Sequence, residues 1–319
     1  SVYLERVLAH AGGEAAAFWA APSLFWWNSS DEVLRGLCIV GIAVSALVTL
    51  GYANVPMMLL LWSIQLSFVS VGQTWFSFGW EIQLLETGML GVFLCPLWDG
   101  RPFPKKPVPF VVILLFRWLI FRVMLGAGLI KWRGDSCWQA LTCLDFHFET
   151  QPIPHPGSWF FHNLPPWLNR LGVAFNHLAE SIAPFFVFGP RGFRILAGLV
   201  IVVFQLSLIS SGNLAFLNWV TLVPALACFD DRTWARVLPG RWVRAAARAR
   251  NETRPSRWHA AAAWSFATAV AFLSIQPVAN LFSERQIMNT SFTPLALVNT
   301  YGAFGSVGRV RNEIVIEGT

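Results

Sequence analysis

Charged residues are scarce in this chain. Asp, Glu, Lys and Arg make up 13% of its 319 residues, whereas about 25% is usual in soluble globular proteins. Cysteine is also rare, and 5 Cys are too few for a disulfide scaffold. The low charge, together with a high apolar content, excludes a disordered or collagen-like chain.

Apolar and aromatic residues are abundant instead. Hydrophobic residues make up 55% of the chain, with 17 Trp and 27 Phe, more than the surface of a soluble fold carries without aggregating. The net charge is +6, and eight of the 23 basic residues lie between Arg232 and Arg257. Most of the others flank apolar stretches, which is typical of membrane topology and not of a nucleic-acid-binding face. The sequence predicts a membrane protein with no nucleic-acid partner.

Eight apolar segments approach or reach the roughly 20 residues needed to cross a bilayer. They cover residues 33–53, 55–71, 78–97, 108–130, 171–188, 194–211, 214–229 and 259–281. We therefore predict an all-α polytopic bundle of about eight spans.

The distribution of Lys and Arg predicts the orientation of the spans. Loops 98–107, 189–194 and 230–258 carry 13 basic residues on one side, against seven on the other, and basic loops favour the cytoplasmic side. The loop 131–170 and the tail 282–319 are then expected in the lumen or periplasm. The segment 1–32 is expected there too, so a further helix is expected upstream of Ser1.

An internal repeat accompanies this topology. Residues 65–76 and 205–216 are identical at six of twelve positions. The offset lays the first four spans over the last four, which predicts parallel four-helix repeats over about 33–130 and 171–281. These repeats form the transmembrane core 33–281.

Charged side chains inside the predicted spans are candidates for buried sites, because such charges usually face the protein interior. Glu81 and Glu86 fall in the third span, and Arg117 and Arg122 in the fourth. Glu86 and Arg122 lie at matching depth and are expected to pair. The pair either lines a proton or substrate path or locks two helices together, and we favour the structural interpretation.

A second polar group lies in the fifth span. Asn176, His177 and Glu180 share one face at helical spacing. They could form half of a metal site, but one His and one Glu are a weak metal signal. A hydrogen-bonded cluster between helices is favoured.

The external loop 131–170 holds alternating charged and aromatic residues. Asp145, His147 and Glu149 alternate with Phe, so in an extended strand all three would point the same way. They could bind a hard or borderline metal ion. An amphipathic strand on the membrane surface is the favoured alternative, and no metal is predicted. Five prolines, at positions 152, 154, 156, 165 and 166, exclude long regular structure and predict an irregular loop.

Two cysteines, Cys137 and Cys143, fall on the oxidising side, and a disulfide between them is expected. Their Cys-x5-Cys spacing differs from that of thioredoxin-like dithiols, so a catalytic thiol pair is the less favoured alternative. Asn28 and Asn289 begin sequons that matter only in a eukaryotic secretory pathway. Motifs for a Ser-His-Asp triad, a phosphate loop, HExxH zinc binding or dinucleotide binding do not stand out, so no catalytic residue or cofactor is predicted.

Several long ungapped stretches resemble the lipase maturation factor family. They lie at residues 75–88, 116–131, 133–152, 211–219, 227–231 and 298–302. The third of these stretches begins with Arg133, Gly134 and Asp135, so Arg133 and Asp135 join the candidate residues of the external loop. The resemblance covers nearly the whole chain from about residue 25.

The resemblance implies a polytopic protein of the endoplasmic reticulum membrane that helps secreted dimeric lipases fold and assemble. In a bacterium the membrane would be the inner one. The family's lipase binding is attributed mainly to a large lumenal C-terminal domain that would begin near the end of this chain, and the partners are membrane lipids and the lipase client. A distant likeness to vitamin K-dependent carboxylases implies the alternative, a membrane enzyme with a lipophilic cofactor or substrate. A thiol-handling partner centred on Cys137 and Cys143 is a third hypothesis.

Overall fold

The computed structural model describes residues 2–253 and 256–312. Ser1, residues 254–255 of the predicted loop 230–258 and residues 313–319 of the predicted tail lie outside this part. Within it all regular secondary structure is helical, apart from one isolated antiparallel bridge between Ser291 and Asn299. The all-α prediction is confirmed.

Two compact units divide the chain. The first unit comprises residues 1–119, 229–280 and 289–300, and the second comprises residues 120–228, 281–288 and 301–319. The boundaries do not follow the predicted repeats, because residues 229–280 pack with the first unit. The parallel repeat stays a prediction.

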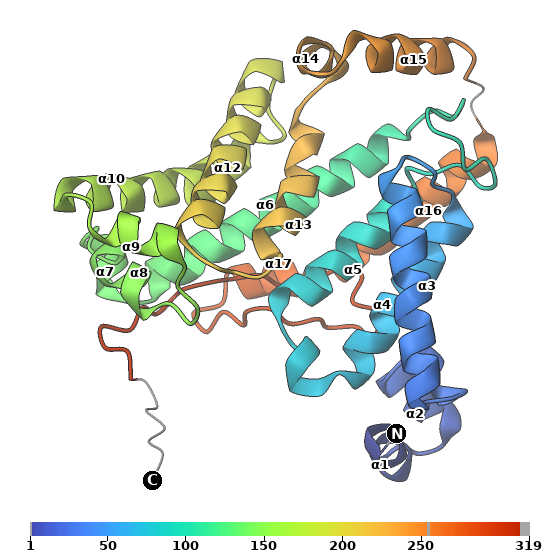
Figure 1. The fold of residues 1–319 in the computed structure, drawn as a ribbon, viewed down its shortest axis with the longest axis horizontal. Helices are drawn as coiled ribbons and strands as arrows, with labels where there is room; N and C mark the ends of the chain where they lie inside the picture. Colours follow the sequence, from blue (N-terminus) through green and yellow to red (C-terminus); the bar gives the residue numbers. More distant parts are fainter. Residues whose placement is uncertain (1, 254–255, 313–319) are drawn as a thin grey trace. The chain divides into compact units, whose positions relative to one another are not determined.

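The first unit contains most of the N-terminal helices. They are α1 (Val2–His10), α2 (Glu14–Ala20), η1 (Leu24–Trp26), α3 (Asp31–Thr49), α4 (Val55–Val71), η2 (Gln73–Phe76) and α5 (Gly79–Val92), with the first turns of α6 (Phe110–Arg133) (Figure 1). Later segments add α14 (Asp231–Val237), α15 (Gly240–Asn251), α16 (Arg257–Leu273) and α17 (Ile275–Leu281).

Side-chain caps fix where the long helices of this unit begin. Asn54 accepts a hydrogen bond from the amide of Met57 at 3.0 Å, and Pro56 follows in the first turn of α4, where a missing N–H costs nothing. Ser30 caps α3 in the same way. Helices α4 and α5 then pack side by side, with Leu66 and Leu85 buried together.

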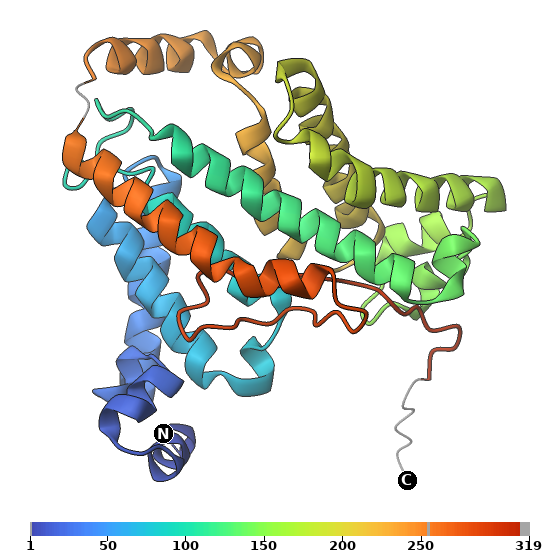
Figure 2. The same ribbon diagram turned by 180° about the vertical axis from the view of Figure 1, so that it is seen from behind.

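The second unit contains the remainder of α6 and the middle of the chain. Its other helices are α7 (Ser136–Gln139), α8 (Leu144–Thr150), α9 (Pro156–His162), α10 (Pro166–His177), the π-helical turn η3 (Leu178–Ile182), α11 (Ala183–Phe186), α12 (Arg191–Ser211), α13 (Leu217–Ala225) and η4 (Leu226–Cys228) (Figure 2). Its core includes Ile120, Met124, Ile201 and Phe204.

Every predicted span coincides with a helix or a series of short helices, but their lengths differ. Helices α3, α6 and α12 are long and apolar enough to cross a membrane, and the bent pair α16–α17 makes a fourth candidate among the described residues. Helix α5 ends at Val92, five residues before the predicted end, and α13 contains Pro224. The eight-span count therefore stays a prediction.

Candidate functional site

A buried ion pair lies in the second unit. The ammonium group of Lys131, in the last turn of α6, contacts both carboxylate oxygens of Glu180 at 2.5 and 2.6 Å and the amide oxygen of Asn176 at 3.0 Å. Asn176 also donates to Glu180 at 3.0 Å. Lys131 and Glu180 expose only 3% and 4% of their surface. All three donors of the ammonium are thus directed at acceptors that the fold supplies.

A local distortion of the fifth predicted span places Glu180. The helix changes to a π-turn over Leu178–Ile182, and the amide of Ala183 donates to the carbonyl of Leu178. Pro184 follows and has no amide hydrogen to continue the regular ladder. Gly128 of α6 lies against this turn, and a Cβ there would come within 3.0 Å of the Glu180 carbonyl oxygen. The absence of a side chain at Gly128 lets the π-turn lie close to α6, so that the Glu180 carboxylate reaches Lys131.

Trp138, in the loop 131–170, covers this ion pair. The Lys131 ammonium lies 5.1 Å from the centroid of the Trp138 ring, close enough for a cation–π interaction. A ring nitrogen of His177 lies 3.0 Å from the Trp138 carbonyl oxygen, and the His177 ring stacks on Trp132. The loop and the buried charges form one connected network.

A disulfide closes the loop that carries Trp138. Cys137 and Cys143 are bonded, as the sequence predicts, and both are buried in a cluster with Val173 and Val307. The other three cysteines, Cys38, Cys95 and Cys228, are not disulfide-bonded. The disulfide therefore restrains the backbone on both sides of Trp138.

The chain after residue 300 packs against the same elements. One carboxylate oxygen of Asp135 accepts from the amide of Val307 at 2.6 Å, and the Trp138 indole donates to the carbonyl of Phe304 at 2.8 Å. A Cβ on Gly134 would collide with the Gly305 carbonyl oxygen. Arg133 donates to Gln286 at 2.7 Å and to the carbonyl of Leu281. The predicted loop residues Arg133 and Asp135 thus fasten the later segments to α6.

The predicted strand around His147 is wrong. Residues 144–150 form α8, so Asp145 and Glu149 share one side while His147 points away from them. His147 is buried against Phe304, and Glu149 lies 3.6 Å from His162. Among the described residues no group of three His, Cys, Asp or Glu is placed to hold a metal ion. The alternation of charged residues and Phe over residues 145–149 predicted a strand wrongly, because a pattern this short, less than two turns of helix, does not distinguish a strand from a helix.

The irregular loop predicted over 131–170 is also partly wrong, since α7, α8 and α9 lie within it. Each is at most 7 residues long, which agrees with the spacing of its prolines.

Burial of His147 makes the stability of the second unit depend on pH. Burial, and secondarily the charge of Lys131, lowers the pKa of His147 from 6.5 to about 4. The unfolded chain therefore binds more protons between pH 6.5 and 4, so stability is full above pH 6.5 and falls as the pH drops through this range. At pH 5 we expect a loss of about 2 kcal/mol relative to pH 7.5.

Denaturant unfolding at pH 7.5 and pH 5.0 measures this loss. A His147→Leu variant should lose correspondingly less between the two values, because it has no imidazole to protonate. Equal losses in the two proteins would contradict the assignment to His147.

The first unit buries a carboxylate of its own. One oxygen of Glu86 accepts hydrogen bonds from both the backbone and the side-chain nitrogen of Asn299, each at 3.1 Å. Glu81 of the same helix accepts from Gln65 at 2.6 Å. Arg117 lies 5.9 Å from the Phe110 ring centroid. All of these charges are buried within the unit.

The predicted ion pair between Glu86 and Arg122 stays a prediction, since the two residues belong to different units. Arg122 is buried in the second unit, where its guanidinium lies 5.9 Å from the centroid of the Tyr301 ring. The sequons begin at exposed asparagines, Asn28 and Asn289, and their glycosylation also stays a prediction.

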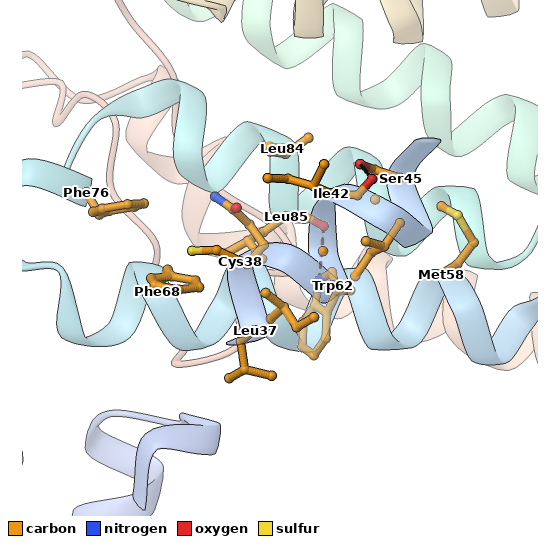
Figure 3. Close-up of a pocket in the computed structure, with 15 residues that line it drawn as sticks. Leu37, Cys38, Ile42, Ser45, Met58, Trp62, Phe68, Phe76, Leu84 and Leu85 are labelled. Atoms are coloured by element: carbon orange, nitrogen blue, oxygen red, sulfur yellow. Dashed lines mark hydrogen bonds between the residues drawn. The ribbon is translucent and has the colours of Figure 1, made fainter. Parts of the chain in front are cut away.

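An apolar pocket lies between α3, α4 and α5 of the first unit. Its volume is about 520 Å³, and Figure 3 shows Leu37, Ile42 and Trp62 among the side chains around it. The Trp62 indole donates to the carbonyl of Leu85 at 3.1 Å, so its polar edge is satisfied within the unit. The lining suits an apolar group and offers no constellation for acid–base catalysis.

The family model "Lipase maturation factor transmembrane domain" matches residues 2–236. The chain belongs to the lipase maturation factor family. It is 47% identical to lipase maturation factor 1 of Bos taurus, over 99% of this chain and 60% of the relative. For lipase maturation factor 1 of Mus musculus the identity is 46%, over 100% of this chain and 59% of the relative.

More distant members match a smaller share of the chain. Lipase maturation factor 2 of Homo sapiens is 35% identical over 69% of this chain and 34% of its own length. The chain thus spans about 60% of the length of lipase maturation factor 1 from cattle or mouse. No solved structure matches this family member.

Sequence reasoning missed two central residues of these sites. From the sequence, Lys131 counts only among the seven basic residues of the side opposite the basic loops, and no buried partner is predicted for it. The sequence does contain one signal that Lys131 is buried. Gly128 lies three residues before it, on the same face of the helix, and a small residue there lets a second helix approach closely. Asn299 carried no such signal, since it lies 213 residues from Glu86.

Proposed function

We propose that this chain is the membrane core of a maturation factor that assists the folding and assembly of secreted dimeric lipases. The observation that carries the proposal is the 47% identity to lipase maturation factor 1 over 99% of the chain. The role is chaperone-like and not catalytic. The names of the relatives favour it over the membrane enzyme, and no contact described above favours that alternative.

We place the protein in the endoplasmic reticulum membrane, or in the inner membrane of a bacterium, with about eight spans arranged as two parallel repeats. The external loop 131–170 and the tail 282–319 would face the lumen or periplasm. The basic loops 98–107, 189–194 and 230–258 on the other side support this orientation.

In this proposal the client is held mainly by a C-terminal domain of the kind the family carries, and the second unit supports that domain. The support is structural: Asp135, Trp138 and Arg133 bond the segments 281–288 and 301–307 to the end of α6. The disulfide and the Lys131–Glu180 pair keep that end rigid.

Rescue of a lipase in cells that lack their endogenous factor tests the function. We expect the chain fused to a family C-terminal domain to restore the activity per mass of secreted lipase, and the chain alone to restore little. If neither form rescues despite correct insertion, the lipase role does not apply to this member.

Two conservative variants of the fusion distinguish a chaperone from an enzyme. Glu86→Gln keeps an oxygen that can accept from Asn299, and His177→Gln keeps an amide that can donate to the Trp138 carbonyl. A chaperone retains rescue in both variants, because the fold is preserved. Complete loss of rescue with unchanged protein level and unfolding midpoint would favour the enzyme.

A further inference from the structure

One surface of the first unit combines positive charge with exposed aromatic rings. It comprises the loop 98–107 and the helices α14 and α15, and we call it the basic surface. The two stretches 98–107 and 230–258 hold eleven basic and four acidic residues. An ion pair between Lys105 and Glu252 joins them within the unit. Figures 1 and 2 both show α15 at an edge of the drawing, with α3, α4 and α5 away from it.

Three of the four arginines of α15 are gathered on one side of the helix, while the fourth, Arg250, lies on the opposite side and contacts Asp231. Arg241, Arg244 and Arg248 follow at intervals of three and four residues, which places them on one face. Trp242, Val243 and Ala246 lie on the opposite side of the helical projection, together with Arg250. This is the amphipathic pattern of helices that lie in the plane of a membrane interface, with basic residues on the polar side.

Large apolar side chains of the loop 98–107, of α14 and α15 and of the first turn of α16 are also exposed. Trp258 is 88% exposed, Trp98 75% and Val237 72%. Trp242 is also exposed, and the Arg241 guanidinium lies 5.9 Å from its ring centroid. Tryptophan favours the boundary between headgroups and acyl chains, so the rings indicate a lipid surface more than a soluble polyanion.

Helices α14 and α15 contain no buried residue. They have 7 and 12 residues, and helices this short are marginal in water without a packed face. A surface that takes up their apolar side would supply the missing packing.

We propose that the basic surface binds the headgroups of anionic phospholipids, with Arg241, Arg244 and Arg248 on the phosphates and the neighbouring tryptophans in the interface. The occupant is the membrane in which the chain sits. Each arginine near an anionic bilayer should raise the preference for anionic over neutral phospholipids by about five-fold.

The experiment uses the full chain in nanodiscs with equal amounts of phosphatidylcholine and phosphatidylserine. Native mass spectrometry of the released protein counts the lipids that it retains. The chain is expected to retain phosphatidylserine in excess, and the triple variant Arg241→Gln/Arg244→Gln/Arg248→Gln to lose that excess by about five-fold or more. Raising the salt from 0.05 to 0.5 M should reduce the excess in the unsubstituted chain, because the charges are exposed.

A matched control removes the same charge elsewhere. Arg35, Arg170 and Arg285 are exposed and lie outside the basic surface, so their triple replacement by Gln should leave the excess unchanged. The unfolding midpoint of both variants verifies that they fold.

Three results would overturn the proposal. The first is that the unsubstituted chain retains no excess of phosphatidylserine. The second is that the α15 triple variant retains the same excess as the unsubstituted chain. The third is that the control variant loses as much of the excess as the α15 variant. Heparin binding through the three arginines without any lipid preference would identify a soluble polyanion as the ligand instead. A failure of lipase rescue leaves the proposal untouched, since lipid retention is measured without a client.

Discussion

Lys131→Met is expected to destabilise the second unit by about 3–5 kcal/mol. The substitution keeps the length and most of the apolar contacts of the side chain but leaves the buried Glu180 carboxylate with only the Asn176 amide as a described partner. Removing one member of a buried ion pair costs more than removing both, because an uncompensated charge stays inside.

The double variant Lys131→Met/Glu180→Leu is the matched control. It has no buried charge at this point, so it should recover most of the lost stability. Denaturant unfolding in detergent and hydrogen exchange over residues 136–150 measure the difference. A loss below about 1 kcal/mol in the single variant, or an equal loss in both variants, would show that the pair is not a structural lock.

Cys137→Ser/Cys143→Ser is expected to destabilise the same unit by about 2 kcal/mol. The disulfide joins residues separated by 6 positions, and chain-entropy arguments give a value of this size for so short a loop. The loosened backbone includes Trp138, so hydrogen exchange should rise over residues 136–146 and at the amide of Val307, which bonds to Asp135.

A variant of a free cysteine separates stability from thiol chemistry. Cys38→Ser should leave unfolding unchanged, because Cys38 is exposed and unbonded. If Cys137→Ser abolished lipase rescue while stability fell by no more than the expected amount, and the client accumulated as mixed disulfides, the thiol-handling hypothesis would replace the structural one.

The sequence predicted the helical class and the positions of the helices, because apolar runs of this length have few other solutions. It also predicted the Cys137–Cys143 pair, since only these two cysteines fall in the loop 131–170. Local periodicity failed at residues 144–150, where helix and strand patterns are too short to distinguish. It also gave no partner for Glu180, because Lys131 is 49 residues away.

The sequence did not predict the boundaries of the two units either. An internal repeat predicts halves that are contiguous in the chain, whereas residues 229–280 pack with the first unit. Which helices associate depends on side-chain packing between distant segments, and apolar patterns alone carry little of that information.

The hydrogen bonds between Glu86 and Asn299 have a consequence for synthesis. A ribosome adding about 5–20 residues per second needs roughly 10–40 s to make the 213 residues between them. During that interval the Asn299 nitrogens that donate to the Glu86 carboxylate have not yet been made. The first unit thus begins with the earliest helices but is completed only when residues 289–300 emerge. The hydrogen bonds between Glu86 and Asn299 can therefore form only after most of the described chain has been synthesised.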